Sequence, residues 1–257
     1  MDTPLFIIKI GGGFLTEKVG ENGAVYLDKI HLFCKVLSSY KQSHPTHRFI
    51  LVHGAGSFGH VPAAEYSLME RFHPKGVLLC EMAMQKLNEI VINSLEQESL
   101  HVFPFHPVDF IVTTKRRISE CYLRPLELML SQGIIPVLHG DVVTDTEQGS
   151  CILSADQIVP FLSKKFKTHR VGFISQSPVY DNKKEVIPLI NLSNYNTIKK
   201  YLGASDGVDV TGGMAGKIKE LIEAAEDNDT ISFVFSGDEK SLTKFLDGED
   251  VGTKVCK

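Results

Sequence analysis

Residues 5–13 read LFIIKIGGG, an almost unbroken apolar run that ends in three consecutive glycines. A continuous run of this kind is typical of a strand that is covered on both faces of a parallel sheet. Similar apolar runs occupy residues 48–53, 134–138, 170–174 and 231–235. We therefore predict a mostly parallel sheet that contains these five segments.

Helical periodicity fills the spaces between the runs. Ile30, Phe33, Cys34, Leu37 and Tyr40 recur at the spacing of an amphipathic helix, and similar stripes occupy residues 84–95 and 218–225. The polar stretch 144–150 predicts a hairpin turn between two apolar flanks. The order of strand, glycine-rich turn and helix favours an α/β fold, a three-layer αβα sandwich.

Composition limits the classes of partner. The chain has 257 residues, of which 43% are hydrophobic and 23% charged, with 27 Lys and Arg against 31 Asp and Glu. This balance gives no broad basic surface, so we expect no nucleic-acid partner. No segment reaches the ~20 apolar residues of a membrane span, so we expect no membrane partner. The 5 cysteines are scattered without CxxC spacing, which favours a reduced, cytoplasmic protein and no metal site.

Two glycine clusters follow predicted strands directly, at residues 11–13 and 54–59. Backbone N–H groups in such turns converge on an anion, and the next helix adds its positive N-terminal end. Two such turns indicate two phosphate groups. The alternative is that either cluster is only a tight connection between a strand and a helix.

A dinucleotide site is a rival interpretation of the second cluster. Gly54, Gly56 and Gly59 match the G-x-G-x-x-G pattern, and Glu81 follows at roughly the distance expected of a ribose-binding acid. Glu81, however, lies within the helical pattern that continues through Met84. A dinucleotide-dependent oxidoreductase therefore stays an alternative that leaves the lysines unexplained.

Three lysines suggest phosphoryl transfer. Lys9 stands at the end of an apolar strand, where burial of an ammonium group is costly without a nearby anion. Lys18 and Lys217 each lie close to a glycine-rich segment, although each alone resembles a surface lysine. Together with two anion-binding turns, such lysines would position and neutralise phosphates.

His60 and Asp156 complete the candidates. His60 closes the second glycine cluster, where an imidazole can donate to a phosphate oxygen. Asp156 begins an apolar-periodic helix, either as its N-cap or as a carboxylate that orients lysines.

The order and spacing of these motifs resemble the amino acid kinase superfamily and, within it, the isopentenyl phosphate kinase family. The resemblance runs from residues 9–12 through 53–60, 136–143 and 154–156 to 209–217, with a similar ending at 248–253. It implies one domain over residues 1–257, with an acceptor lobe at about 1–165 and a nucleotide lobe at about 166–257. It also implies Mg-ATP as phosphoryl donor, a phosphorylated small molecule as acceptor, and a homodimer.

The resemblance implies a role for each candidate. The catalytic residues would be Lys9, Lys18, His60, Asp156 and Lys217; the ATP-binding residues would be Lys9, Gly11, Gly12, Gly13, Gly56, Gly213 and Lys217; and the acceptor-binding residues would be Gly54, Ala55, Gly56, His60, Gly140 and Ala155. His60 is the discriminating residue, because family members that phosphorylate carboxylates lack it. The implied reaction converts isopentenyl phosphate to isopentenyl diphosphate, with another phosphate or a phosphonate such as fosfomycin as the alternative acceptor.

The chain departs from the family pattern at two places. Ala155 stands where glycine is usual, which would add a methyl group near the acceptor. Residues 174–181 lack the acidic residues that relatives usually have there, which leaves the nucleotide preference open.

Overall fold

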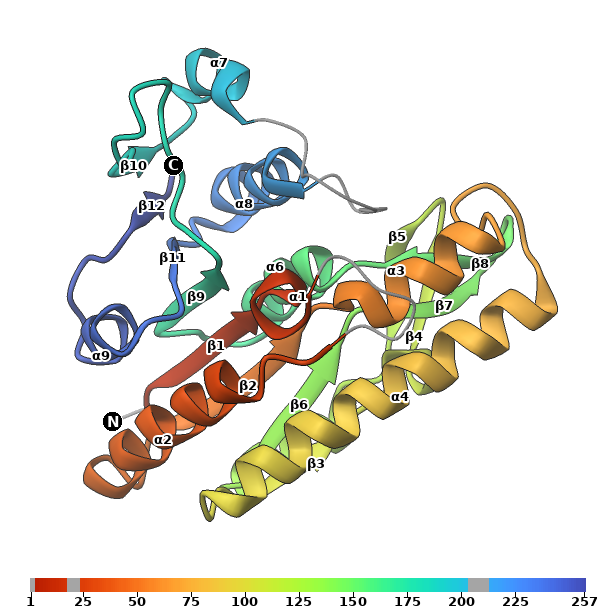
Figure 1. The fold of residues 1–257 in the computed structure, drawn as a ribbon, viewed down its shortest axis with the longest axis horizontal. Helices are drawn as coiled ribbons and strands as arrows, with labels where there is room; N and C mark the ends of the chain where they lie inside the picture. The colour runs from red at the N-terminus through yellow and green to blue at the C-terminus, as the bar shows by residue number, and fades with distance from the viewer. Residues whose placement is uncertain (1–2, 18–23, 203–212) are drawn as a thin grey trace.

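A computed structural model describes residues 3–17, 24–202 and 213–257. Its main sheet has eight strands, with helices on both faces (Figure 1). In spatial order the strands are β10 (Leu189–Ile190), β12 (Thr253–Val255), β11 (Ser232–Ser236), β9 (Arg170–Ser175), β1 (Leu5–Ile10), β2 (Arg48–His53), β6 (Ile135–His139) and β3 (Val102–Pro104). Every neighbouring pair is parallel except β11 with β12. The predicted α/β class and mostly parallel sheet are confirmed.

Side-chain alternation along β1 explains why its apolar run is continuous. Leu5 and Ile7 belong to one hydrophobic core, whereas Phe6 and Ile8 belong to another on the opposite face. Successive side chains of a strand point to opposite faces, so both faces of this strand need apolar residues. The five predicted strands correspond to β1, β2, β6, β9 and β11, two of them shifted by one residue.

Six helices cover the two faces of the sheet. One core contains side chains of α5 (Arg124–Ser131), α6 (Ala155–Lys165) and α8 (Gly213–Asn228); the other contains side chains of α2 (Leu27–Ser43), α4 (Pro74–Gln97) and α9 (Glu239–Leu246). In Figure 1, α2 and α4 lie side by side across the front of the sheet. The three helical stripes in the sequence correspond to α2, α4 and α8. The three-layer αβα sandwich is therefore confirmed.

A second, four-stranded sheet begins directly after β6 of the main sheet, because its strand β7 follows β6 in the chain. Its order is β5 (Arg117–Cys121), β4 (Ile111–Thr114), β7 (Asp141–Asp145) and β8 (Gly149–Leu153). The predicted hairpin turn joins β7 to β8, and the strands extend further into the polar stretch than the sequence indicated. Asp145 is buried there because its carboxylate accepts hydrogen bonds from three backbone N–H groups and from Thr113.

Short elements make the remaining connections. They are α1 (Gly12–Leu15), α3 (Gly56–Glu65), α7 (Tyr195–Ile198) and the 3₁₀ turns η1 (Pro107–Asp109) and η2 (Lys199–Tyr201). In the described part of the chain, no helix is both long enough and apolar enough to span a bilayer. The carboxyl ends of four neighbouring strands meet at one edge of the main sheet because the strands are parallel. These strands are β1, β2, β6 and β9. Residues that follow those strands are thereby brought together.

Candidate active site

A buried ionic triad lies at this edge of the sheet. The Asp156 carboxylate accepts hydrogen bonds from Lys9 Nζ at 2.8 Å and from Lys217 Nζ at 3.2 Å. The three residues are 7%, 5% and 6% exposed, respectively. Lys9 faces α6 and α8 because odd-numbered residues of β1 point to that side, as Leu5 and Ile7 do. Asp156 comes from α6 and Lys217 from α8.

Electrostatics keep the triad net positive near neutral pH. Burial raises the pKa of Asp156, but Lys217 and Lys9 more than reverse this and bring it down to about 2. Burial lowers the pKa of Lys9 to about 8, against the raising influence of Asp156. Two ammonium groups and one carboxylate leave about one positive charge at pH 7. A net positive charge of this kind would favour the binding of a phosphate group next to the triad.

Ser154, not Asp156, caps α6. Its hydroxyl accepts a hydrogen bond from Asp156 N at 3.1 Å, and Gln157 Oε1 accepts one from Ser154 N at 3.4 Å. This arrangement is a capping box. Asp156 is the second residue of the helix, so its carboxylate is left to hold the lysines. The alternative that Asp156 is the N-cap is wrong.

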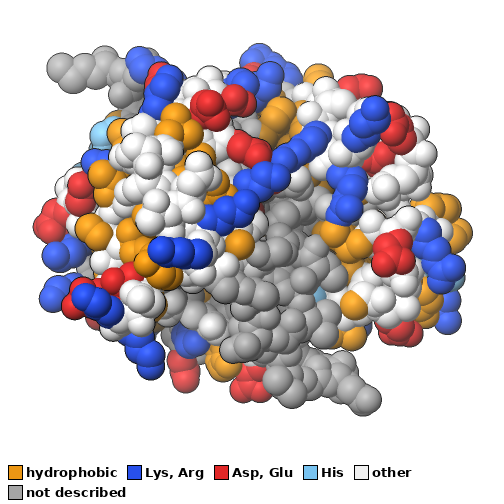
Figure 2. All heavy atoms as spheres, turned by 90° about the horizontal axis from the view of Figure 1, so that it is seen from above, with side chains coloured by type: hydrophobic (Ala, Val, Ile, Leu, Met, Phe, Trp, Pro, Cys, Tyr) orange, Lys and Arg blue, Asp and Glu red, His pale blue; other side chains and the backbone are white. Residues whose placement is uncertain are grey.

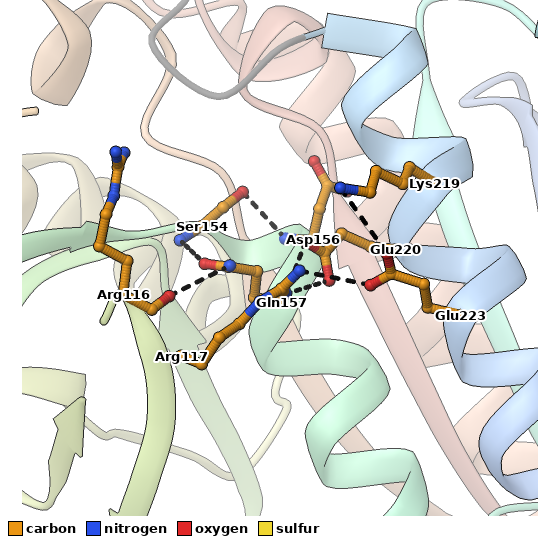
Figure 3. A network of polar contacts seen from close by, with 8 residues as sticks. All are labelled: Arg116, Arg117, Ser154, Asp156, Gln157, Lys219, Glu220 and Glu223. Atoms are coloured by element: carbon orange, nitrogen blue, oxygen red, sulfur yellow. Dashed lines mark hydrogen bonds and ion pairs between the residues drawn. The ribbon is translucent and has the colours of Figure 1, made fainter. Parts of the chain in front are cut away.

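Support for the triad reaches into the small sheet (Figure 3). Gln157 Nε2 donates to the carbonyl oxygen of Arg116 at 3.4 Å, which ties α6 to the β4–β5 hairpin. Arg117 extends from β5 to α8, where it pairs with Glu220 at 2.8 Å and Glu223 at 3.3 Å. The helix that carries Lys217 is thus joined to the sheet beside the start of α6.

The two glycine-rich turns interlock backbone against backbone. A Cβ on Gly12 would lie 2.3 Å from Gly56 N, and a Cβ on Gly54 would lie 2.6 Å from Gly12 N. Gly56 also has φ +54° and has no room beside the Thr16 hydroxyl. Only glycine meets both demands at position 56. Anions bound on the two turns would therefore be neighbours.

Thr16 locks the two turns together, a contact that the sequence analysis missed. Its hydroxyl donates to Gly12 O at 3.1 Å and accepts from Ser57 N at 3.0 Å. Gln176, just after β9, donates to Gly13 O at 2.8 Å. The Ser57 hydroxyl oxygen is buried without a hydrogen-bond partner in the described chain, as expected of a group that serves a ligand. No local motif marked the contacts of Thr16 with Ser57 and of Gln176 with Gly13, because these two contacts join segments 41 and 163 residues apart.

Gly140 lies close to two backbone nitrogens and one carbonyl oxygen. A Cβ built on Gly140 would lie 3.3 Å from Ala155 N, 3.5 Å from Leu153 O and 3.9 Å from Ala55 N. Ala155 is the first residue of α6, and Ala55 caps α3. The lack of a side chain at Gly140 therefore leaves a cradle beside two N–H groups at helix starts, a geometry that suits an anion. We call these three residues the glycine cradle.

The side chain of Ala155 packs in the core. It is 3% exposed and belongs to the hydrophobic cluster that includes Leu153 and Ile158. The prediction that its methyl group lies near the acceptor stays a prediction.

The remaining predicted site residues lie on different elements, and some lie outside the described residues. Gly11 follows β1 and donates to Ile174 O at 2.8 Å, and Gly13 is in α1. Gly213 starts α8 with φ +58°, four residues before Lys217, while His60 lies in the first half of α3 and is partly buried. Lys18 and the family-like stretch 209–212 lie outside the described residues.

Helix α4 has a buried apolar stripe and an exposed side next to it. Met84, Leu87 and Val91 are buried, and Val91 packs in the core below α2. Met84 approaches the start of α3, since its sulfur lies 2.8 Å from where a Cβ of Gly59 would be. Met82 is 45% exposed and lies outside this buried stripe.

Comparison with known proteins fits this geometry. Residues 4–236 match the Amino acid kinase family. The chain is 32% identical to the isopentenyl phosphate kinase of Methanocaldococcus jannaschii, with 98% of each chain covered. It is likewise 32% identical, with the same coverage, to the isopentenyl phosphate kinase of Haloferax volcanii. The chain belongs to the isopentenyl phosphate kinase branch of the amino acid kinase family.

The family's fold is equally evident in three dimensions. A solved isopentenyl phosphate kinase structure superposes with a TM-score of 0.81 at 26% identity, covering 98% of this chain and 99% of that one. In this family member, Glu81 lies in the middle of α4, not at the end of a strand. The dinucleotide interpretation is therefore wrong.

Proposed function

We propose that this protein transfers the γ-phosphoryl group of Mg-ATP to isopentenyl phosphate, forming isopentenyl diphosphate and ADP. The observation that supports the proposal is that Asp156 of the buried triad directly follows Ala155 of the glycine cradle. The buried triad of Lys9, Asp156 and Lys217 supplies net positive charge, and the glycine cradle supplies neutral N–H donors. The interlocked turns at Gly12 and Gly54 join the two sites.

The reaction balances without a strong base. A terminal oxygen of the acceptor phosphate forms a bond to the γ-phosphorus, while the bond from that phosphorus to the β–γ bridging oxygen breaks and ADP leaves. A phosphomonoester is mostly dianionic at neutral pH, since its second pKa is about 6. The main barrier is repulsion between two anions, which Lys9, Lys217 and the N–H groups offset.

Magnesium enters this proposal as part of the substrate Mg-ATP. Among residues 3–17, 24–202 and 213–257, no group of three His, Cys, Asp or Glu side chains is arranged to hold a metal ion. The Asp156 carboxylate is already occupied by two lysines. Mg²⁺ commonly binds through nucleotide phosphates with few protein ligands, so we derive no step through a protein-held metal.

The wider assignments are also proposals. One domain with an acceptor lobe ending near residue 165 fits the continuous main sheet, which joins β2 and β9 through β1. A homodimer is supported by exposed apolar side chains on α3 and α4, namely Val61, Leu78 and Met82.

A reducing compartment such as the cytoplasm is supported by buried Cys34 and Cys80, for which burial raises the pKa to about 12. The surface in Figure 2 mixes Lys and Arg with Asp and Glu on its described part, which fits a small-molecule partner.

A coupled ADP-release assay tests the proposed function. The acceptors are isopentenyl phosphate, dimethylallyl phosphate and fosfomycin, each compared with ATP alone. We expect the highest kcat/KM with isopentenyl phosphate. A preference for fosfomycin would establish the alternative acceptor, and no acceptor-dependent release with any of the three would overturn the kinase proposal. His60→Ala belongs in the same series, because a raised KM for the acceptor alone is expected if His60 contacts its phosphate.

A further inference from the structure

Two buried histidines lie directly beneath the glycine cradle. His53 ends β2, His139 ends β6, and the two residues are paired across the parallel strands. Both are fully buried, with ring centroids 5.4 Å apart. Each is followed by a glycine, Gly54 or Gly140, whose backbone shapes the proposed acceptor site. The proposed mechanism does not use either ring.

The hydrogen bonds of these rings define their tautomer. His53 Nδ1 lies 3.1 Å from Gly54 O, and His139 Nδ1 lies 3.0 Å from Gly140 O. A carbonyl oxygen can only accept, so the proton of each ring must be on Nδ1. In a neutral ring, Nε2 is then an acceptor.

Each Nε2 has a partner from another element. His139 Nε2 lies 2.9 Å from His106 Nδ1, which can donate to it. His53 Nε2 lies 3.1 Å from Asn88 Oδ1 on α4, and an amide oxygen cannot donate to the ring. For a neutral His53, the Asn88 amide must turn its nitrogen toward the ring, an orientation equivalent in shape. Both rings are thereby held at two points.

The surroundings keep both rings neutral. Burial lowers the pKa of His53 to about 4 and that of His139 to about 3. Asp141 Oδ2 is 3.9 Å from His139 Nδ1, but burial and the neighbouring carboxyl of Glu81 raise the pKa of Asp141 well above its ordinary value. His106 is the remaining titratable group in contact with the pair. A neutral donor beneath each glycine therefore persists through the physiological pH range.

We propose that His53 and His139 are positioning residues for the acceptor phosphate, acting through the carbonyl groups of Gly54 and Gly140. In a trans peptide the C=O and N–H groups point in opposite directions. When His53 holds the Gly54 carbonyl downward, the N–H of Ala55 in the same peptide faces the cradle. His139 fixes the Gly140 carbonyl in the same way. The face of Gly140 that lacks a side chain is thereby held next to Ala155 N. This inference rests on the proposed function, since it concerns the same acceptor.

Paired substitutions separate the two hydrogen bonds of each ring. In His53→Asn and His139→Asn, the amide nitrogen can occupy the place of Nδ1 and keep the bond to the glycine carbonyl. In His53→Gln and His139→Gln, the amide nitrogen can occupy the place of Nε2, and the bond to the carbonyl is lost. Exposed His101→Gln is the control for a histidine outside this cluster.

The kinetic test measures KM for isopentenyl phosphate, KM for ATP and kcat in all five variants. We expect the Gln variants at 53 and 139 to raise the acceptor KM by about 10-fold, the factor that ~1.4 kcal/mol represents, with little change in the ATP KM. The Asn variants should recover most of this loss. Equal acceptor KM values in Asn and Gln variants, or equal rises in both substrate KM values, would reduce the histidines to packing residues and overturn the inference.

Two further results keep the outcomes distinct. If the wild-type protein fails to turn over isopentenyl phosphate, the proposed function fails before the variants are compared. If a Gln variant does not fold, long-range ¹H–¹⁵N spectra of the wild-type protein with ¹⁵N-histidine give the answer instead. We expect two rings that stay neutral with the proton on Nδ1 from pH 5 to pH 8. Rings that are charged, or protonated on Nε2, would overturn the inference.

Discussion

The two halves of the proposed site would hold anions by opposite means. On the side of Lys9 and Lys217, full charges are buried and balanced by the Asp156 carboxylate. At the glycine cradle, the donors are neutral backbone N–H groups above two neutral histidines. Charged groups titrate and depend on their partners, whereas backbone dipoles do neither. The two halves should therefore respond differently to mutation and to pH.

The largest effect is expected at the centre of the charged half. Asp156→Asn leaves two buried ammonium groups without their carboxylate, and breaking such a buried pair typically costs about 3–5 kcal/mol of unfolding free energy. We expect kcat to fall about 100-fold as well, because the lysines lose their positions. Urea unfolding and steady-state kinetics measure the two effects.

The matched control is Asp227→Asn. Its carboxylate is 66% exposed and lies 3.8 Å from Lys164 Nζ. We expect its unfolding free energy to change by less than about 0.5 kcal/mol. If Asp156→Asn behaved like this control, the triad would not organise the charged half.

The next largest effect is expected from a substitution that changes the glycine cradle and leaves the lysines in place. Gly140→Ala adds a methyl group 3.3 Å from Ala155 N and fills the cradle, without requiring a left-handed backbone. We expect the acceptor KM to rise about 10-fold to 100-fold, which corresponds to ~1.4–2.7 kcal/mol, while the ATP KM changes little. Initial-rate kinetics with each substrate varied in turn measure the difference.

Gly133→Ala serves as the comparison. It has φ +78° and no atom within 4 Å of the added Cβ. Backbone strain should lower stability by about 1 kcal/mol, but both KM values should stay unchanged. A rise of the ATP KM in Gly140→Ala equal to that of the acceptor KM would remove the distinction between the halves.

The two halves of the site should also differ in how their kinetics depend on pH. Lys9 is charged below its pKa of about 8 and loses its charge above it. The kcat/KM for ATP should therefore be level near pH 7 and decline above about pH 8, approaching tenfold per pH unit. With saturating ATP, the bound phosphates stabilise charged Lys9, so the kcat/KM for the acceptor should stay level to higher pH. Identical profiles for the two substrates would contradict this account.

The smallest effect concerns the link between β5 and α8. Arg117→Ala removes its pairs with Glu220 and Glu223, which are partly exposed and screened by salt. We expect a loss of about 0.5–1 kcal/mol in unfolding free energy at low ionic strength, and less at 1 M salt. Arg124→Ala is the control, because its partner Glu127 lies in the same helix. Equal losses in the two variants would show that the link between the elements adds nothing.

Local patterns in the sequence predicted much of the fold and part of the site. The runs that became β1 and β2 carry their own signal, because both faces of each strand are buried. Lys9 was recognisable as a candidate site residue because it places an ammonium group in an otherwise apolar strand. Proximity of Lys9, Asp156 and Lys217 depends on crossovers between distant segments, which only the family resemblance suggested.

Features that depend on three-dimensional contact were missed or misjudged. In the sequence, Asp156 resembles an N-cap. In the structure, Ser154 is the N-cap of α6 and forms a capping box with Gln157. His53 and His139 resemble ordinary strand ends, and their role depends on Asn88 and His106 from other elements. One signal was available, since both histidines directly precede a glycine at a strand end.

The proposed reaction passes a phosphoryl group from ATP to a phosphomonoester. ADP release alone does not separate this transfer from ATP hydrolysis, so ³¹P NMR of the reaction with isopentenyl phosphate is the most direct test. The account predicts loss of the phosphomonoester signal and growth of two coupled diphosphate doublets in step with ADP. Accumulation of inorganic phosphate, with the phosphomonoester signal unchanged, would contradict it.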